Sequence, residues 1–171
     1  MKNFLYMAAV ACLALFASCE KQGVEHTGDP TGKLYGRWVL DTKDIVTVNG
    51  TEEPVSKSTD YTDKRFFLGI GESPTPFAAA KEGALISFDI NDDNATKITY
   101  NAKPRQITFL EALYLPKEGP SMILYDTYDV VDLTDDKLTL RQEMTVRSGA
   151  LVNIKHTTTY TFHRLVERPQ Q

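Results

Sequence analysis

Apolar and polar residues alternate along most of the chain after residue 32, which is the period-two pattern of half-buried β-strands. The clearest case is the segment 138–146, in which apolar side chains alternate with Thr, Arg and Glu. Successive side chains of a strand point to opposite faces, so we expect Arg141 and Glu143 to face water. The residues expected to be buried on this segment are Leu138, Leu140, Met144 and Val146.

Other segments carry the same signal and are separated by turn-forming residues such as Asn49-Gly50 and Ser148-Gly149. Two longer stretches, 51–63 and 71–82, are expected to be rim loops, the second with one helical turn at 77–81. Eight strands joined mostly by short turns predict one all-β domain, a single closed antiparallel up-and-down barrel. The predicted strands are 37–48, 64–70, 84–90, 96–101, 105–115, 121–133, 138–146 and 151–165.

The first 18 residues have the composition of a signal peptide rather than of a folded element. Lys2 supplies a positive start, and the apolar run from Phe4 to Phe16 is too short for a permanent membrane-spanning helix. The ending Phe-Ala-Ser-Cys resembles a bacterial lipobox, which implies cleavage before Cys19 and acyl chains on its sulfur. A plain secretory signal followed by a chance cysteine is the alternative.

Residues 20–32 are polar and contain three glycines and one proline. This composition cannot form a core, so we expect a flexible tether. The chain then divides into a signal peptide at 1–18, a lipidated cysteine and tether at 19–32, and a barrel domain at 33–171. Glu20 follows Cys19 in place of the aspartate associated with inner-membrane retention, so we expect anchoring in the outer membrane, on its periplasmic or its surface leaflet.

Composition and charge narrow the classes of partner. The 171 residues are 42 % hydrophobic and 25 % charged, which is ordinary for a soluble globular domain. The net charge of −4 comes without a basic patch, so a nucleic-acid partner is not expected. Both cysteines lie within the first 19 residues, which argues against a disulfide scaffold and a structural zinc site in the domain.

The sequence offers no catalytic constellation. His26 lies in the tether, and His156 and His163 lie on the last predicted strand at an odd separation, which directs them to opposite faces. The chain contains neither a Gly-x-Ser-x-Gly elbow nor a paired-histidine metal motif. We therefore expect that the protein is not an enzyme and that it has no metal site and no cofactor.

The two ends of the domain resemble those of a known family. Gly36-Arg37-Trp38 is similar to the Gly-x-Trp signature that begins the first strand of lipocalins. The closing segment 159–165, preceded by 132–140, resembles the end of the lipocalin-like domain lipoproteins of the Bacteroidetes type. The resemblance implies a small barrel on a lipid anchor, in which Gly36, Trp38 and Arg164 close one end.

A closed meander requires the first and last strands to pair, and we take Trp38 opposite Arg164 as the register; the alternative is that Trp38 is an ordinary core residue and Arg164 a solvated strand end. With Trp38 opposite Arg164, both side chains point into the barrel and the guanidinium can cover the indole as a cation–π contact. Lipocalins cover their signature tryptophan with an arginine in a similar way. The same register pairs Leu40 with Phe162, Thr42 with Tyr160, and Val46 with His156.

The function depends on whether the barrel is hollow, because eight-stranded barrels either fill their interior with side chains or hold one small ligand. The leading hypothesis is an outer-membrane lipoprotein that binds or carries a small apolar or amphipathic ligand. The alternative is a non-enzymatic accessory subunit with a filled barrel that contacts an envelope protein. The candidate cavity-lining residues are Leu40, Phe88, Tyr100, Phe109, Leu140, Met144, Tyr160 and Phe162.

Overall fold

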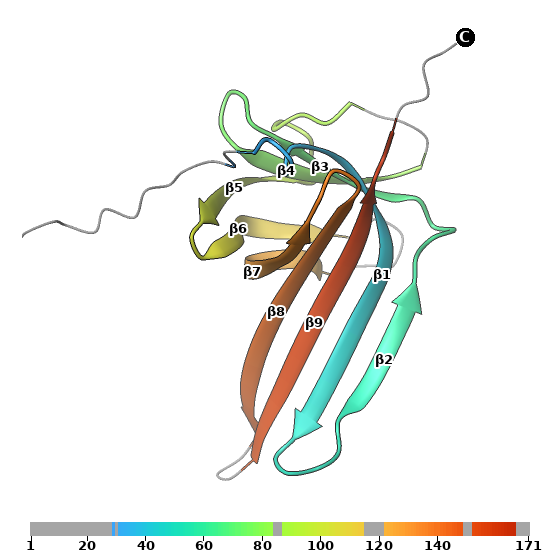
Figure 1. The fold of residues 1–171 in the computed structure, drawn as a ribbon, viewed down its shortest axis with the longest axis vertical. Coiled ribbons are helices and arrows are strands. Elements are labelled where there is room, and N and C mark those ends of the chain that lie inside the picture. The colour runs from blue at the N-terminus through green and yellow to red at the C-terminus, as the bar shows by residue number, and fades with distance from the viewer. Residues whose placement is uncertain (1–28, 30, 84–86, 115–121, 149–151, 167–171) are drawn as a thin grey trace, which may run out of the picture.

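The computed structural model describes residues 29, 31–83, 87–114, 122–148 and 152–166 (Figure 1). Every regular element in these residues is a β-strand. The described strands are β1 (Gly36–Asn49), β2 (Val55–Asp60), β3 (Phe66–Gly71), β4 (Phe77–Glu82), β5 (Ala95–Ala102), β6 (Arg105–Tyr114), β7 (Met122–Leu133), β8 (Lys137–Ser148) and β9 (Val152–Arg164).

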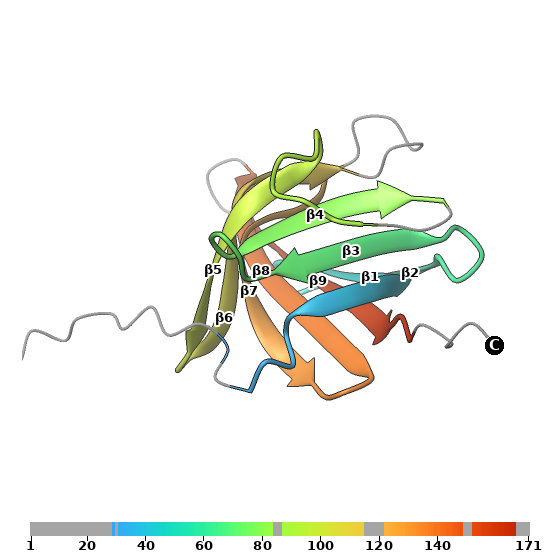
Figure 2. The ribbon, with the colours of Figure 1, turned by 90° about the horizontal axis from the view of Figure 1, so that it is seen from above.

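The strands form one antiparallel sheet that closes on itself. Neighbouring strands follow the order β1-β3-β4-β5-β6-β7-β8-β9, and β9 returns to pair with β1. Figure 2 shows the resulting ring from above, with β3 and β4 across the interior from β7 and β8. The expected closed antiparallel barrel of eight strands is therefore confirmed, and β2 is one strand more than expected.

Long β1 makes room for the extra strand because it changes partners along its length. Its first four residues, 36–39, pair with β3, whereas residues 42–47 pair with β2 on the same side. The segment 51–63 therefore contains a strand, where the sequence predicted a rim loop. All six residues of β2 are polar or lie at an exposed position, which is why its hydrophobic pattern gave no strand signal.

The prediction for the middle of the chain was wrong at two neighbouring places. The segment 77–82, expected to be a loop with a helical turn, is strand β4 between β3 and β5. Its three consecutive alanines favour a helix by propensity, but ladder pairing on both sides and burial of Ala78 and Ala79 override that preference. Of the predicted strand 84–90, residues 87–90 are irregular, and 84–86 lie outside the described residues.

Phe88 lies outside the barrel, although the sequence placed it among the cavity-lining residues. Leu68 and Ile70 belong to the core, so Gly69 between them faces outward. A side-chain carbon at Gly69 would overlap the ring of Phe88, and the Lys81 ammonium lies 5.5 Å from the centre of the same ring. The absence of a side chain at Gly69 therefore leaves room for the Phe88 ring on the outer surface.

Side chains from all eight barrel strands fill the interior. The largest fully buried ones include Trp38 and Leu40 from β1, Phe109 from β6 and Phe162 from β9. Rings of β6, β7 and β9 pack in series, with Tyr128 6.0 Å from Tyr160 and 5.8 Å from Phe109, both in edge-on geometry. The core is thus built of aromatic and aliphatic side chains in contact, as expected for a barrel of this size.

Four strands continue beyond the barrel as an open sheet, which we call the arm. It consists of β2 and the far parts of β1, β9 and β8 (residues 42–49, 152–159 and 142–148), in the order β2-β1-β9-β8 (Figure 1). We call the face that continues the barrel interior the inner face. Met144 and Val146 lie on it and are 51 % and 44 % exposed, so the expectation that they are buried was wrong. Leu138 and Leu140 are fully buried as expected, and Arg141 and Glu143 are exposed.

The register between the first and last strands was predicted correctly only as far as Leu40. Trp38 pairs with Arg164 and Leu40 with Phe162, as expected. Asp41 is then an extra residue, a β-bulge, so that Thr42 pairs with Thr161 and not with Tyr160. Beyond the bulge every pair is shifted by one residue; Tyr160 faces Lys43, His156 faces Thr47, and Val46 faces Thr157.

Candidate functional site

The first candidate for a functional site is the end of the barrel at which β1 begins. Trp38 and Leu34 are both fully buried there, and the indole Nε1 of Trp38 donates a hydrogen bond of 2.9 Å to the carbonyl oxygen of Leu34. Residues 31–35 directly before β1, which we call the entry segment, therefore fold back over the indole. This end of the barrel is closed by protein groups, consistent with the role that the resemblance implies for Trp38.

Arg164 covers the other side of the same end. Its guanidinium carbon lies 4.2 Å from the centre of the Trp38 ring, which is the expected cation–π contact. Its Nε donates to the carbonyl of Asp135 at 2.5 Å, Nη1 to that of Tyr35 at 3.0 Å, and Nη2 to that of Lys33. One side chain thus connects the entry segment, the β7–β8 turn and β9.

Gly36 is required by this arrangement. Its φ angle of 146° lies in a region that side chains disfavour, and a Cβ atom there would overlap Nη1 of Arg164. The three residues named from the resemblance, Gly36, Trp38 and Arg164, therefore lie together. They form a structural closure and present no open space to a ligand.

Asp29 stabilises the entry segment, although the sequence assigned it to the tether. The carboxylate accepts hydrogen bonds from the Leu34 backbone N–H at 2.6 Å and from the Thr31 N–H and hydroxyl at 3.0 and 2.7 Å. Burial raises the pKa of Asp29, but these bonds outweigh burial and hold the pKa below its ordinary value. The ordered domain thus includes at least one residue before position 33.

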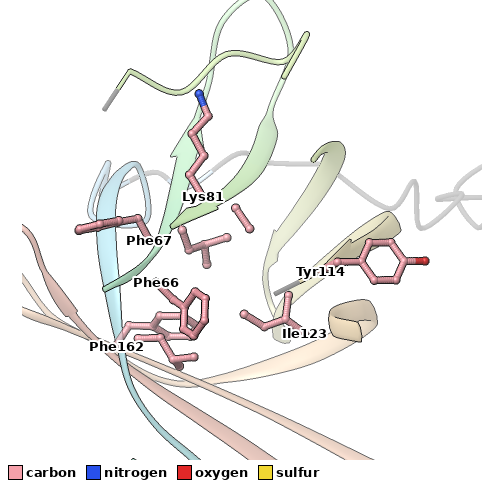
Figure 3. A pocket seen from close by; sticks show the side chains of 9 residues that line it. Phe66, Phe67, Lys81, Tyr114, Ile123 and Phe162 are labelled. Carbon is pink, nitrogen blue, oxygen red and sulfur yellow. The ribbon is translucent and has the colours of Figure 1, made fainter. Parts of the chain in front are cut away.

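The second candidate is a pocket in the barrel interior, shown in Figure 3. Phe66, Ile123 and Phe162 point toward one another there, whereas Lys81 and Tyr114 extend away from the centre (Figure 3). The space open to a water-sized sphere is about 10 Å³, which is room for about one water molecule. This pocket cannot hold a ligand without rearrangement of the aromatic rings.

Only two of the expected cavity-lining residues, Leu40 and Phe162, line this pocket. Four others are buried elsewhere in the core, and Phe88 and Met144 lie outside the barrel. Among the core residues, burial raises the pKa of the Tyr160 hydroxyl far above its ordinary value. The four residues packed in the core are Tyr100, Phe109, Leu140 and Tyr160.

The third candidate is a shallow depression on the outer surface of about 380 Å³. Val39, Phe67 and Leu165 give it an apolar floor, and Arg65 and His163 stand at its border. His163 is held by Asp41, whose Oδ1 lies 2.6 Å from the imidazole Nδ1. The bulge at Asp41 therefore places a carboxylate beside this histidine, but the depression is open and the imidazole is already hydrogen-bonded.

The two strand histidines lie on opposite faces, as their separation predicts. His156 lies on the inner face of the arm, where its Nδ1 is 3.0 Å from the Thr47 hydroxyl. Within the described part of the chain, no three His, Cys, Asp or Glu side chains gather where they could hold a metal ion.

The fourth candidate for a functional site is the inner face of the arm. Residues paired directly across neighbouring strands share a face, so the register gives its rows from β2 to β8. The apolar members with the largest exposure are Val55 at 69 %, Met144 at 51 % and Val146 at 44 %. The rows are Lys57-Ile45-Thr158-Gln142, Val55-Thr47-His156-Met144, and Asn49-Ile154-Val146.

Charge is divided between the two faces of the arm. The inner face carries Lys43 and Lys57, and the register places no Asp or Glu of the described arm residues on it. The acidic residues Asp44, Asp60 and Glu143 belong to the rows of the outer face. The described residues of the inner face thus combine apolar, neutral polar and basic side chains without an acidic one, on a protein whose net charge is −4.

The arm was not predicted as a site because its strands alternate as barrel strands do. One feature of the sequence pattern does distinguish the far halves of these strands from the halves that line the barrel. Polar residues, Gln142, His156 and Thr158, enter the otherwise apolar positions of the far halves. In the structure, the extra strand β2 widens the sheet beside the far half of β1.

Comparison with known protein families, with curated proteins and with solved structures gives no match for this chain. Among the residues that the structure describes, no helix has the length and apolarity needed to cross a membrane.

Proposed function

We propose that this protein is a non-enzymatic interaction module of the bacterial cell envelope, anchored in the outer membrane through acyl chains on Cys19. Its lipocalin-like barrel is the scaffold, and the inner face of the arm binds a partner protein. The observation that carries the proposal is the exposure of Val55, Met144 and Val146 on one face of a sheet. Met144 and Val146 lie together at the β8 border of this face and Val55 lies at its β2 border, and exposed apolar side chains gathered on one face mark interaction surfaces in soluble domains.

The charge pattern indicates the chemistry of the partner. Lys57 and Lys43 lie on the inner face on the Val55 side of the arm, and the acidic side chains of the arm lie on the opposite face. A complementary partner surface would place acidic residues opposite the lysines and apolar residues opposite the exposed apolar side chains, since such complementarity favours encounter and register. The exposed apolar side chains are Val and Met rather than the Trp and Phe that anchor proteins in bilayers, which favours a protein over a lipid surface.

The predicted anchor fits this role. Nine residues lie between Cys19 and Asp29, the first described residue, which makes ten steps along the chain, and an extended chain covers at most about 3.6 Å per step. The barrel would then remain within about 36 Å of the membrane surface, where envelope proteins are concentrated. The tether would allow the arm to reorient toward a partner in the same membrane.

Carriage of a small ligand is less well supported. The interior pocket of about 10 Å³ compares with roughly 300 Å³ for a typical ligand site, and aromatic rings fill the space around it. The apolar side chains that could have lined a cavity are either packed in the core, as Phe109 is, or exposed on the arm, as Met144 is. The distribution of apolar surface therefore favours an external partner.

Photo-crosslinking in cells that produce the full chain tests the proposal. A photoreactive amino acid at Val55, on the inner face, should give an adduct with one discrete protein larger than this chain. The matched control is Ser56, which is the next residue of β2, is also exposed and points to the outer face. It should give little of the same adduct, and Lys57→Glu should reduce the adduct formed at Val55.

Two results would overturn the proposal. One is equal adduct formation from Val55 and Ser56, which indicates collision without a face preference. The other is the absence of any protein adduct from Val55 together with a small molecule that native mass spectrometry finds bound to the purified full chain. The second result would support the ligand-carrying hypothesis instead.

A further inference from the structure

We infer that two copies of this chain associate edge to edge through residues 143–147 of β8, forming a two-fold symmetric dimer in which the two arms make one continuous antiparallel sheet. This inference does not rest on the proposed partner, because it follows from the backbone border and the sequence of β8, although Met144 and Val146 also belong to the inner face. Three features of β8 support it: an available edge, a self-complementary sequence, and exposed apolar side chains beside that edge.

The edge is available because β7 leaves β8 early. The paired residues of β8 end at Arg141, which lies opposite Asp129. The side-chain amide of Gln142 then donates to the carbonyls of Tyr125 and Thr127, at 2.9 and 3.3 Å, and ends the contact between the strands. Among the described strands, β8 pairs beyond this point with β9 alone, and its lower half forms one border of the arm (Figure 1). Its backbone N–H and C=O groups on that border are therefore open to another strand.

The sequence of this edge is complementary to itself. In a two-fold antiparallel pair centred on Thr145, Glu143 of one copy lies opposite Arg147 of the other, and the reverse pair forms on the far side of the axis. Met144 lies opposite Val146 of the second copy on the other face. Directly opposed residues point to the same face, so the charged pairs gather on the outer face and the apolar pairs on the inner face.

This pairing would cover the exposed apolar side chains and add an ion-pair partner for the charged ones. Met144 and Val146, about half exposed in one copy, would cover each other across the new strand pair. Glu143 already lies 2.8 Å from Lys155 of its own copy, and Arg147 of the second copy would add a cation on its other side. Edge strands that avoid association carry like charges or a lysine toward the edge, whereas opposite charges four residues apart attract an antiparallel copy.

The other border of the arm does not have this property. A two-fold pair centred on β2 at Lys57 would place that lysine directly opposite its own copy. Like charges directly opposite each other destabilise a strand pair. The two borders of the arm therefore differ, and β8 is the one suited to a second copy. Dimerisation there would also join the two inner faces into one larger apolar surface.

Cysteine crosslinking of the detergent-solubilised full chain tests the dimer. Thr145→Cys places a thiol at the two-fold axis, so a short bis-maleimide should convert most of the protein to a crosslinked species of twice the mass. Thr157→Cys is the matched control, since Thr157 lies on the same face but on β9, directly beside Glu143 and away from the border. It should remain uncrosslinked under the same conditions.

Charge exchange provides a second test that does not depend on the cysteine. Glu143→Arg alone should weaken dimerisation at least tenfold in sedimentation velocity, because an arginine would then face Arg147 of the second copy. Arg147→Glu alone should do the same, and the double exchange should restore the wild-type dimer. Circular dichroism should show the same folded spectrum for all three variants, since both side chains are exposed.

A monomer for the wild-type chain at all concentrations tested would overturn the inference. So would equal crosslinking at positions 145 and 157, or a double exchange that fails to restore what each single exchange removes. None of these results changes the outcome expected for crosslinking at Val55, which lies on the opposite border of the arm. Failure of the dimer and failure of the partner-binding proposal are thus distinguishable.

Discussion

At the scale of single residues, Arg164 has the largest role in closing the barrel. Its guanidinium covers the Trp38 ring and donates to three backbone carbonyls from separate segments. Those carbonyls belong to turns and entry residues that no ladder satisfies, and unsatisfied groups of this kind are costly. The planar arginine side chain, with donors in a fixed fork, serves all of them at once.

We predict that Arg164→Ala lowers the free energy of unfolding by about 2–4 kcal/mol, measured by urea denaturation. Arg164→Lys should recover less than half of this loss, because one ammonium cannot reach three carbonyls and cover the indole. The control is Arg105→Ala, at an exposed position that begins β6, which should change stability by less than about 0.5 kcal/mol. Equal effects at the two positions would show that the contacts of Arg164 are not stabilising.

Asp29 makes the stability of the entry segment depend on pH. Because its pKa is lowered on folding, its contribution is present above the unfolded value of about 3.8 and is lost as the pH falls through the folded value. Asp29→Asn should therefore reduce stability by about 1–2 kcal/mol at neutral pH and by much less near pH 2. Urea midpoints across this pH range, with exposed Asp63→Asn as the control, measure the difference. A gap between Asp29→Asn and wild type that stays constant with pH would contradict this account.

At the scale of elements, strands β1, β8 and β9 each belong to two environments. Their near parts line the closed barrel, where Leu40, Leu138 and Phe162 are buried, and their far parts form the arm. The bulge at Asp41 lies at the boundary, where β1 exchanges β3 for β2, and the Tyr61 N–H donates to the Asp41 carbonyl at 2.7 Å. Bulges bend a strand and increase its twist, which suits the position where the closed barrel opens into the arm.

We predict that two substitutions on one face of β8 lower the free energy of unfolding by different amounts. Leu140→Ala should lower stability by about 2–5 kcal/mol, since it leaves a cavity in the core. Met144→Ala, four residues along the same face, should cost less than about 1 kcal/mol because that side chain is half exposed. Urea denaturation of both variants measures the ratio. Similar losses would mean that the arm is covered in the native protein.

At the scale of the whole molecule, the protein joins a filled barrel to an open sheet. The barrel closes because β9 pairs with β1, whereas among the described strands the arm has two unpaired borders and exposed apolar side chains on one face. Exposed edges and exposed apolar side chains carry a risk of aggregation, and both proposals made above would cover them. The partner and dimer proposals assign the face and the β8 border to different contacts.

Membrane anchoring is expected to depend on one residue. Cys19→Ser should move the protein from the membrane fraction to the soluble fraction, because each buried acyl methylene contributes about 0.8 kcal/mol and no other anchor is expected. Fractionation with immunodetection of the full chain measures this, with Ser18→Ala as a control that keeps the cysteine. A Cys19→Ser variant that sediments with membranes as the wild type does would refute the lipobox interpretation.

The sequence by itself determined the strand type, the closure of the barrel and the residues at its closed end. Alternation fixes which side chains of a strand share a face, and the pairing of the ends follows because a meander with free ends leaves edges. The choice of Trp38 opposite Arg164 came from the resemblance to lipocalins, and the side-chain alternation agrees with it. Alternation also predicts that the Met144 side chain points inward, but it does not predict whether other residues cover that side chain.

Only the tertiary structure decided which inward-pointing side chains are covered. Met144 and Leu140 share a face of β8, yet one is half exposed and the other is fully buried, because the strands that cover Leu140 end before they reach Met144. Whether Phe109 fills the barrel or lines a cavity likewise depends on packing between distant strands. Alternation is a local property of the backbone, whereas burial depends on strand lengths, the bulge at Asp41 and the added strand β2, and these are fixed only by pairing across the whole sheet.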